Sequence, residues 1–167
     1  MQVVKSIAEL SKADAYRELQ SQLTALFAGE RDALANCANM TALLYEALPE
    51  LNWAGFYFLR GRDLVLGPFQ GKVACVRIAM GRGVCGTAAA RRETVIVADV
   101  NEFPGHIACD AASRSEIVIP LIHESRLLGV LDLDSPRPAR FDHEDGKGLA
   151  GLVEALLRSA DLDRFVG

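Results

Sequence analysis

No apolar run in the 167-residue chain approaches the roughly 18–20 residues that a membrane-spanning helix needs. The N-terminal segment also lacks the apolar core and the small-residue cleavage site of a secretory signal peptide. These two absences predict a soluble protein in the cytoplasm.

Positive charge is scarce and scattered along the chain. Lysine and arginine number 18 against 22 aspartate and glutamate residues, which gives a net charge of −4 and a pI near 5.4. The sequence contains no lysine and arginine block that could follow a phosphate backbone. The composition therefore argues against nucleic acid and anionic membranes as partners and favours a small molecule.

Cysteine pairs of the C-x-x-C type are also missing, because the four cysteines at 37, 75, 85 and 109 stand apart. In a reducing compartment such cysteines do not form structural disulfides, so each is either buried or reactive. Cys37 lies on the apolar stripe of a predicted helix, where a thiol behaves as a small hydrophobic group. We expect Cys37 to be a core residue.

The length and the 50% hydrophobic composition predict one domain over residues 1–167 with a substantial core. Helical spacing of apolar residues predicts a helix pair over about 13–48 and a helix over about 142–160 that begins at the capping residue Asp142. Alternation of period two predicts a sheet and pocket over about 51–135. The expected fold class is α+β: a central, mostly antiparallel sheet of about six strands, with helices packed on one face and a ligand pocket on the other.

Two connections, 67–74 and 100–115, are longer than typical loops and are expected to be functional. Residues 81–86 match G-x-G-x-x-G between a predicted strand and a predicted helix. A dinucleotide site of that type needs repeated β-α-β units, whereas the strands predicted here form hairpins, such as the one that turns at Gly61. The glycine turn has another use, because free N–H groups at a helix start can hold a carboxylate or a phosphate.

A zinc site is disfavoured by spacing. Cys75, Cys85 and Cys109 with His106 offer four donors, but structural zinc ligands usually come in pairs about two to four residues apart. A cysteine hydrolase would need a histidine to orient its thiol. His106 is very close to Cys109 in the sequence, and the other two histidines sit at a strand end and a helix start.

Acidic residues gather in the stretch "LLGVLDLDS". Asp132 and Asp134 alternate with leucines, so both carboxylates point to one strand face, which Leu128 and Val130 are expected to share. Glu116 adds a third acid at the start of the preceding strand. Close carboxylates repel one another, which raises the pKa of at least one and suits it to donate a proton or to bind a cation. An edge strand with a solvated face is the alternative explanation.

Four segments span most of residues 52–136: "NWAGFYF", "LVLGPFQGKVACVRIAMGRGVCGTA", "DVNEFPGHIACDAASRSEIVIPL" and "LLGVLDLDSP". With the closing "ARFDHEDGKGL", they resemble GAF domains. The cysteines at 75, 85 and 109 within these motifs make the chain similar, more narrowly, to the free methionine-(R)-sulfoxide reductase family.

This resemblance implies reduction of free L-methionine (R)-sulfoxide to L-methionine. Cys109 is implied to attack the sulfoxide sulfur and to remain as a sulfenic acid, which Cys75 then converts to a disulfide, with Cys85 as an alternate or relay. Thioredoxin is implied as the external reductant, with no bound cofactor and no metal.

The resemblance also assigns the pocket. Trp53 and Tyr57 are implied to surround the methyl and sulfoxide groups, and Glu116, Asp132 and Asp134 to hold the ammonium and supply the proton. Because an acidic pocket disfavours a thiolate, the substrate's ammonium or a protonated carboxyl would have to offset that effect. The alternative function is a non-catalytic GAF sensor with buried or redox-tuned cysteines, and the sequence leaves a homodimer open.

Overall fold

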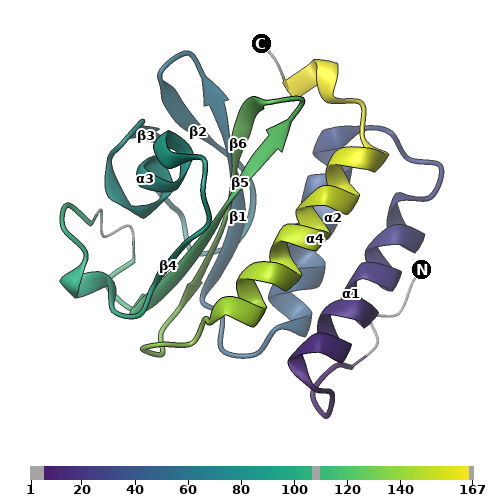
Figure 1. The fold of residues 1–167 in the computed structure, drawn as a ribbon, viewed down its shortest axis with the longest axis horizontal. Helices are drawn as coiled ribbons and strands as arrows, with labels where there is room; N and C mark the ends of the chain where they lie inside the picture. Colours follow the sequence, from purple (N-terminus) through teal and green to yellow (C-terminus); the bar gives the residue numbers. More distant parts are fainter. Residues whose placement is uncertain (1–5, 107–109, 166–167) are drawn as a thin grey trace.

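A central antiparallel sheet organises the molecule (Figure 1). The computed structural model describes residues 6–106 and 110–165, and within them the sheet has six strands in the order β3-β2-β1-β6-β5-β4. The strands are β1 (Trp53–Arg60), β2 (Asp63–Gly71), β3 (Arg77–Ala79), β4 (Val95–Val97), β5 (Ser115–His123) and β6 (Arg126–Ser135). All the paired strands run antiparallel. The predicted α+β class is confirmed.

The helices lie on both faces of this sheet. Figure 1 shows α1 (Lys12–Phe27), α2 (Ala33–Ala47) and α4 (His143–Ser159) together on one face, as predicted. The shorter α3 (Gly83–Arg91) lies on the opposite face, where it covers the strands that line the pocket. No helix in the described ranges 6–106 and 110–165 is both long and apolar enough to cross a membrane.

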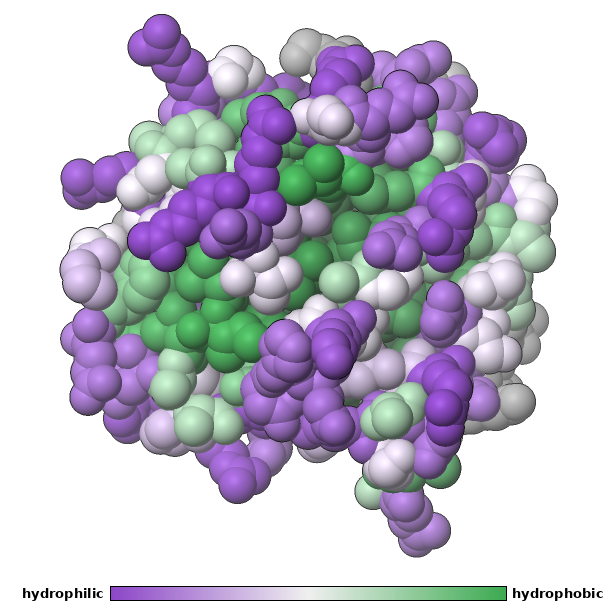
Figure 2. Space-filling model, in the orientation of Figure 1, coloured by the Kyte–Doolittle hydropathy of each residue, from purple (hydrophilic) through white to green (hydrophobic). Residues whose placement is uncertain are grey.

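Two apolar cores flank the sheet. The helix-side core includes Leu19, Leu44, Phe56, Leu131 and Leu149, which come from α1, α2, α4 and one face of β1 and β6. The pocket-side core includes Tyr57, Leu64, Val84, Val118 and Val130 from the opposite face and from α3. Because each face of the sheet packs against one of these cores, the central strands are buried on both faces. On the molecular surface, Figure 2 shows apolar areas between protruding hydrophilic side chains.

Side-chain caps define where the helices begin. Ser11 accepts a hydrogen bond from the backbone of Asp14 at the start of α1, and Asp32 does the same for Ala35 at the start of α2. Asp142 caps α4 as predicted, and the carboxylate of Asp145 accepts in return from the Asp142 backbone N–H. This reciprocal arrangement is a capping box, which satisfies donors that the first turn leaves free.

The prediction of a long loop over residues 67–74 is wrong, because β2 extends to Gly71. A register shift between Gly55 and Tyr57 of β1 allows β2 to continue pairing as far as Gly71. The next strand is short, because its pairing with β2 covers Arg77–Ala79. The residues between these strands therefore form a short exposed segment rather than a long loop.

The prediction for Leu128 is also wrong. The pairing between β5 and β6 shifts, so that Leu121 faces Gly129 while Ile122 faces Leu127. Leu128 has no cross-strand partner in that register and packs into the helix-side core, away from the acidic face. The solvated edge-strand explanation for the acids fails as well, because β6 lies between β1 and β5.

A buried polar network joins α1 to α4. The Tyr16 hydroxyl donates to Asp145 Oδ1 at 2.8 Å, and Lys12 Nζ lies 2.6 Å from Asp145 Oδ2. The ring of Tyr16 packs directly over Gly148, where any added Cβ would overlap it. Gly148 is therefore needed for close helix packing, although a glycine weakens a helix by itself.

We expect Gly148→Ala to lower the free energy of unfolding by about 1–3 kcal/mol, because the Tyr16 ring has to move and overpacking is destabilising. Gly151→Ala is the matched control on the same helix, because its Cβ would meet open space. That control should gain about 0.5–1 kcal/mol from helix propensity. Urea denaturation of both variants tests the pair, and equal effects of the two substitutions would contradict the packing argument.

Candidate active site

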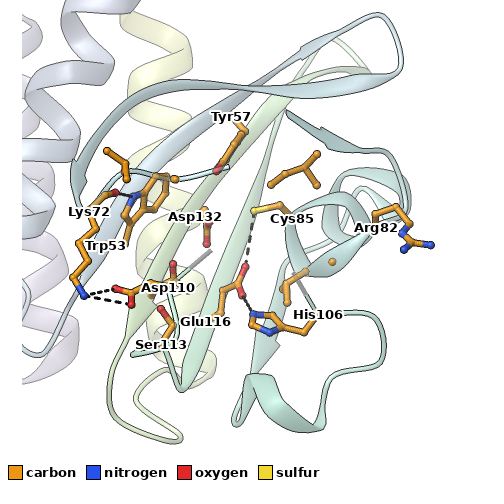
Figure 3. Close-up of a pocket in the computed structure, with 16 residues that line it drawn as sticks. Trp53, Tyr57, Lys72, Arg82, Cys85, His106, Asp110, Ser113, Glu116 and Asp132 are labelled. Atoms are coloured by element: carbon orange, nitrogen blue, oxygen red, sulfur yellow. Dashed lines mark hydrogen bonds and ion pairs between the residues drawn. The ribbon is translucent and has the colours of Figure 1, made fainter. Parts of the chain in front are cut away.

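A small cavity of about 40 Å³ lies between α3 and the pocket-side face of the sheet (Figure 3). Six of the predicted site residues line it: Trp53, Tyr57, Cys85, Glu116, Asp132 and Asp134. They come from β1, α3, β5 and β6. The structure therefore brings together one pocket from four separate segments of the chain.

Strand register explains why these side chains meet. Asp134 of β6 pairs with Trp53 of β1 on one side and with Glu116 of β5 on the other. Side chains directly opposite one another on neighbouring strands share a face. Asp132 lies on the same face two residues earlier, opposite Gly55 of β1. Because Gly55 has no Cβ, the Trp53 ring can lie across this position.

Aromatic rings form one wall of the cavity. The rings of Trp53 and Tyr57 stack with centroids 5.9 Å apart, and the rings of Trp53 and Phe69 stack with centroids 5.5 Å apart. Trp53 Nε1 donates to the carbonyl of Lys72 at 3.1 Å, and the Tyr57 hydroxyl donates to the carbonyl of Cys75 at 2.9 Å. The same two aromatic residues thus fix the backbone of the segment that contains Cys75.

The three carboxyl groups that line the cavity, those of Glu116, Asp132 and Asp134, have raised pKa values. Burial raises the pKa of Asp132 to about 7, and burial followed by repulsion from Asp132 and Asp134 raises the pKa of Glu116 well above its ordinary value. The pKa of Asp134, a partly exposed residue, is raised by burial of its carboxyl group and by Asp132. The predicted upward pKa shift is present in all three carboxyl groups, so the pocket favours a proton or a cation.

The same environment acts on Cys85 and His106. The Cys85 thiol donates to Glu116 Oε1 at 3.9 Å, and its pKa is raised first by burial and then by Asp132 and Glu116. His106 Nε2 lies 3.8 Å from Glu116 Oε2, and burial lowers the pKa of this imidazole. Cys85 is therefore a protonated thiol and His106 a neutral ring near pH 7.

The cysteines divide by their surroundings. Cys37 is a fully buried free thiol in the helix-side core, which confirms that prediction. Cys75 is disulfide-bonded and only partly buried. Cys109, the predicted nucleophile, lies outside the described residues 6–106 and 110–165.

The sequence did not identify the polar residues that anchor the connection ending at β5. Asn52 Nδ2 donates to Asp110 Oδ2 at 3.2 Å and to Ser113 Oγ at 3.0 Å. Lys72 Nζ lies 3.5 Å from the Asp110 carboxylate, which links the connection to the Cys75 segment. The length of this connection indicated function, but no local pattern singled out these four residues.

The glycine motif serves the turn into α3. Gly81 N–H donates to the Gly86 carbonyl at 2.8 Å, and a Cβ on Gly86 would overlap the carbonyl of Ala79. The sheet around it is antiparallel, so the β-α-β frame of a dinucleotide site is not formed. Gly83 and Val84 at the first turn of α3 line the cavity, where helix N–H groups lack partners within the helix.

This sheet, with α2 and α4 packed on one face, α1 packed against those helices, and a pocket under α3 on the other face, defines a GAF domain. Residues 38–156 match the GAF domain family. The chain is 54% identical to free methionine-R-sulfoxide reductase of Escherichia coli over 93% of this chain and 96% of that protein. It is 42% identical to the Saccharomyces cerevisiae protein of the same name, over 91% and 89% of the two chains.

A crystal structure of the same kind of protein supports this placement. The free methionine-R-sulfoxide reductase of Neisseria meningitidis, in complex with its substrate, superposes with a TM-score of 0.90 and 45% identity, covering 95% of each chain. The chain therefore belongs to the free methionine-R-sulfoxide reductase family.

The buried carboxyl groups predict a pH dependence of stability. The folded-state pKa of Asp132 is near 7. The contribution of its protonated side chain to the free energy of unfolding is therefore fully present below about pH 4 and is lost as the pH rises towards 7. Asp132→Asn removes this titration, so the variant should gain stability relative to the parent by about 1.4 kcal/mol per pH unit across that window. Urea denaturation at pH 5 and pH 7 measures the difference.

Glu46→Gln on α2 is the control, since that side chain is exposed, and its effect should be the same at both pH values. A stability difference between the parent and Asp132→Asn that does not change with pH would show that Asp132 is already ionised in the fold.

Proposed function

We propose that the chain reduces free L-methionine (R)-sulfoxide to L-methionine, with Cys109 as the nucleophile and thioredoxin as the reductant, in the cytoplasm. The observation that carries this proposal is the group of carboxyls with raised pKa values facing the aromatic wall of a small cavity. A free amino acid with a methyl sulfoxide matches both surfaces. The family membership of the chain supports the same reaction.

Each end of the substrate has a complementary group in the pocket. Asp132 and Asp134 would hold the ammonium as carboxylates, because a bound cation restores the ionised form that burial disfavours. Glu116 would stay protonated and accept an ammonium N–H with its carbonyl oxygen. The rings of Trp53 and Tyr57 would contact the methyl group and the sulfoxide. The N–H groups at the first turn of α3 would receive the substrate carboxylate.

The chemistry needs a nucleophile and an acid. The thiolate of Cys109 attacks the sulfoxide sulfur, a carboxyl group protonates the oxygen, and methionine leaves while Cys109 becomes a sulfenic acid. Glu116 suits the acid role, because its raised pKa keeps it protonated near neutral pH. The Cys75 thiol then displaces water from the sulfenic acid and forms a disulfide, which the thioredoxin dithiol reduces by exchange.

Cys75 suits the resolving role better than Cys85. Cys75 is partly exposed and is disulfide-bonded here, so an external dithiol can reach it. Cys85 is 3% exposed and its pKa is raised by burial, which makes it a poor nucleophile and hides it from a protein reductant. Cys85 then stays a relay or alternate thiol.

We expect free methionine (R)-sulfoxide to be reduced at least about a hundredfold faster than N-acetylmethionine sulfoxide, the (S)-epimer or an oxidised peptide. Acetylation removes the ammonium and leaves carboxyls in a small cavity without their cation, which costs several kcal/mol. A competition between racemic free sulfoxide and an oxidised peptide in one tube, analysed by mass spectrometry, measures the preference. Efficient reduction of the oxidised peptide would refute the hypothesis that the pocket encloses both ends of a free amino acid.

Two cysteine variants control this experiment. Cys109→Ser should lose turnover by a factor of at least about 1,000, because a serine hydroxyl is a far weaker nucleophile than a thiolate. Cys37→Ser should keep it, since Cys37 lies in the helix-side core. If no sulfoxide is consumed at all by the parent, the chain is instead a non-catalytic GAF sensor.

An exposed apolar surface beside Cys75 suits a protein reductant. Val73 is 88% exposed and Val76 is 63% exposed, so apolar side chains flank the disulfide-bonded Cys75 on both sides. A protein that docks over this segment would remove both valine side chains from water, which favours association. Because disulfide exchange needs direct contact with the attacked sulfur, thioredoxin would cover these residues.

Val76→Asp should therefore raise the KM for thioredoxin by about tenfold, because it places a charge in the apolar contact. Turnover supported by dithiothreitol should be unchanged, since a small dithiol does not use the surface. Leu34→Asp is the matched control, an apolar residue of α2 that is 60% exposed. Equal loss with both reductants would place Val76 in substrate binding rather than in docking.

A further inference from the structure

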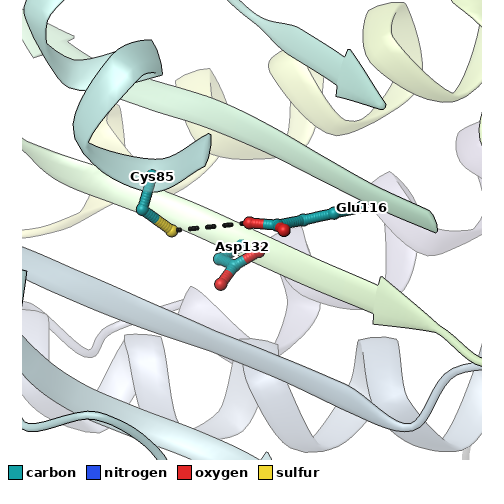
Figure 4. Close-up of side chains that lie close together, drawn as sticks. All are labelled: Cys85, Glu116 and Asp132. Atoms are coloured by element: carbon teal, nitrogen blue, oxygen red, sulfur yellow. Dashed lines mark hydrogen bonds between the residues drawn. The ribbon is translucent and has the colours of Figure 1, made fainter. Parts of the chain in front are cut away.

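Three donor side chains of different chemistry converge at the base of the cavity (Figure 4). Cys85 comes from the first turn of α3, Glu116 from β5 and Asp132 from β6. One donor atom from each lies within 4.8 Å of the others, and all three residues are buried. The separation of Cys85 Sγ from Glu116 Oε1 is 3.9 Å.

A second observation points to a ligand at this place. The Oδ1 atom of Asp132 is buried, and no hydrogen bond to it is found among the described residues. The residue as a whole is 6% exposed and lines the cavity. A buried carboxylate oxygen without a partner is costly, and a bound cation would satisfy it.

We propose that Cys85, Glu116 and Asp132 bind one divalent transition-metal ion of the Zn²⁺ or Co²⁺ type. His106 lies beside this cluster, with its Nε2 atom 3.8 Å from Glu116 Oε2, but it is outside the group of three donors. This is not the cysteine set that the sequence spacing disfavoured, because Cys75 is disulfide-bonded here and takes no part. In the site proposed here, the carboxylates of Glu116 and Asp132 act as ligands in place of the Cys75 and Cys109 thiols of that set.

The donor set selects the class of metal. A thiolate ligand suits zinc and cobalt, whereas Mg²⁺ and Ca²⁺ prefer sites made of oxygen alone. In a tetrahedral zinc site, sulfur and oxygen ligands are about 3.6 Å apart, given bond lengths near 2.3 and 2.1 Å. The observed 3.9 Å between Cys85 Sγ and Glu116 Oε1 is close to this, and all the donor atoms lie within 4.8 Å of one another.

The ion would act as an inhibitor. This consequence rests on the proposed function, in which Glu116 and Asp132 hold the substrate's ammonium. An ion on the same carboxylates takes the place of that ammonium, so metal and substrate exclude each other. Metal binding also occupies Cys85 as a thiolate and releases its proton, which removes it as a relay thiol.

Cobalt(II) titration of the oxidised protein tests the site. With Cys75 in its disulfide, Cys37 and Cys85 are the free thiols among the described residues. Coordination of Co²⁺ by a thiolate gives a sulfur-to-cobalt charge-transfer band in the near ultraviolet. We expect one equivalent of Co²⁺ to bind with this band, and excess Zn²⁺ to abolish it.

Variants locate the ion. Cys85→Ser should remove the band, while Cys37→Ser, which changes the other buried thiol, should keep it. Glu116→Gln should weaken Co²⁺ binding by about tenfold or more, because it removes one anionic ligand. It also serves as a second test if Cys85→Ser fails to fold, which thermal unfolding monitors.

A missing band in the folded parent, or a band that survives in folded Cys85→Ser, would overturn the proposal. Both results are read without substrate or reductant. Turnover of the metal-free, reduced protein tests the proposed function separately, so either proposal can fail while the other stands.

Discussion

Removal of water from the Glu116 and Asp132 carboxyl groups is the constraint on which the site depends. In water these groups would be ionised at neutral pH, but beneath α3 their charged forms lose hydration and repel each other, so their pKa values rise. Such a pocket is stable with protons or with a bound cation. The proposed acid catalysis, ammonium recognition and metal binding would all follow from this one property, and the same burial keeps Cys85 protonated.

The position of β6 in the sheet makes this burial tolerable. Leu131 and Leu133 point into the helix-side core, while Asp132 points from the same strand into the cavity. Each fully buried leucine contributes about 1.5–3 kcal/mol through removal of apolar surface from water. The apolar face of the central strand thus offsets the cost of carboxyl groups on its other face, which an edge strand would have left in solvent.

The aromatic wall connects binding to redox chemistry. Trp53 and Tyr57 face the cavity with their rings, and their polar atoms hold the carbonyls of Lys72 and Cys75. The side chains proposed to contact the sulfoxide therefore also position the segment whose cysteine is proposed to resolve the sulfenic acid. On the outer side of that segment, Val76 is exposed to a reductant.

Features that depend on near neighbours in the chain could be predicted from the sequence. The cap at Asp142, the helices, the shared face of Asp132 and Asp134, and the core position of Cys37 follow from local hydrogen bonds and from the periods of helix and strand. Strand register could not be read in this way, because it joins residues far apart in sequence. Only the tertiary structure decided that β2 runs on to Gly71, that Leu128 leaves the acidic face, and that Cys85 meets the carboxyls, since each depends on long-range pairing and on the packing of α3 against the sheet.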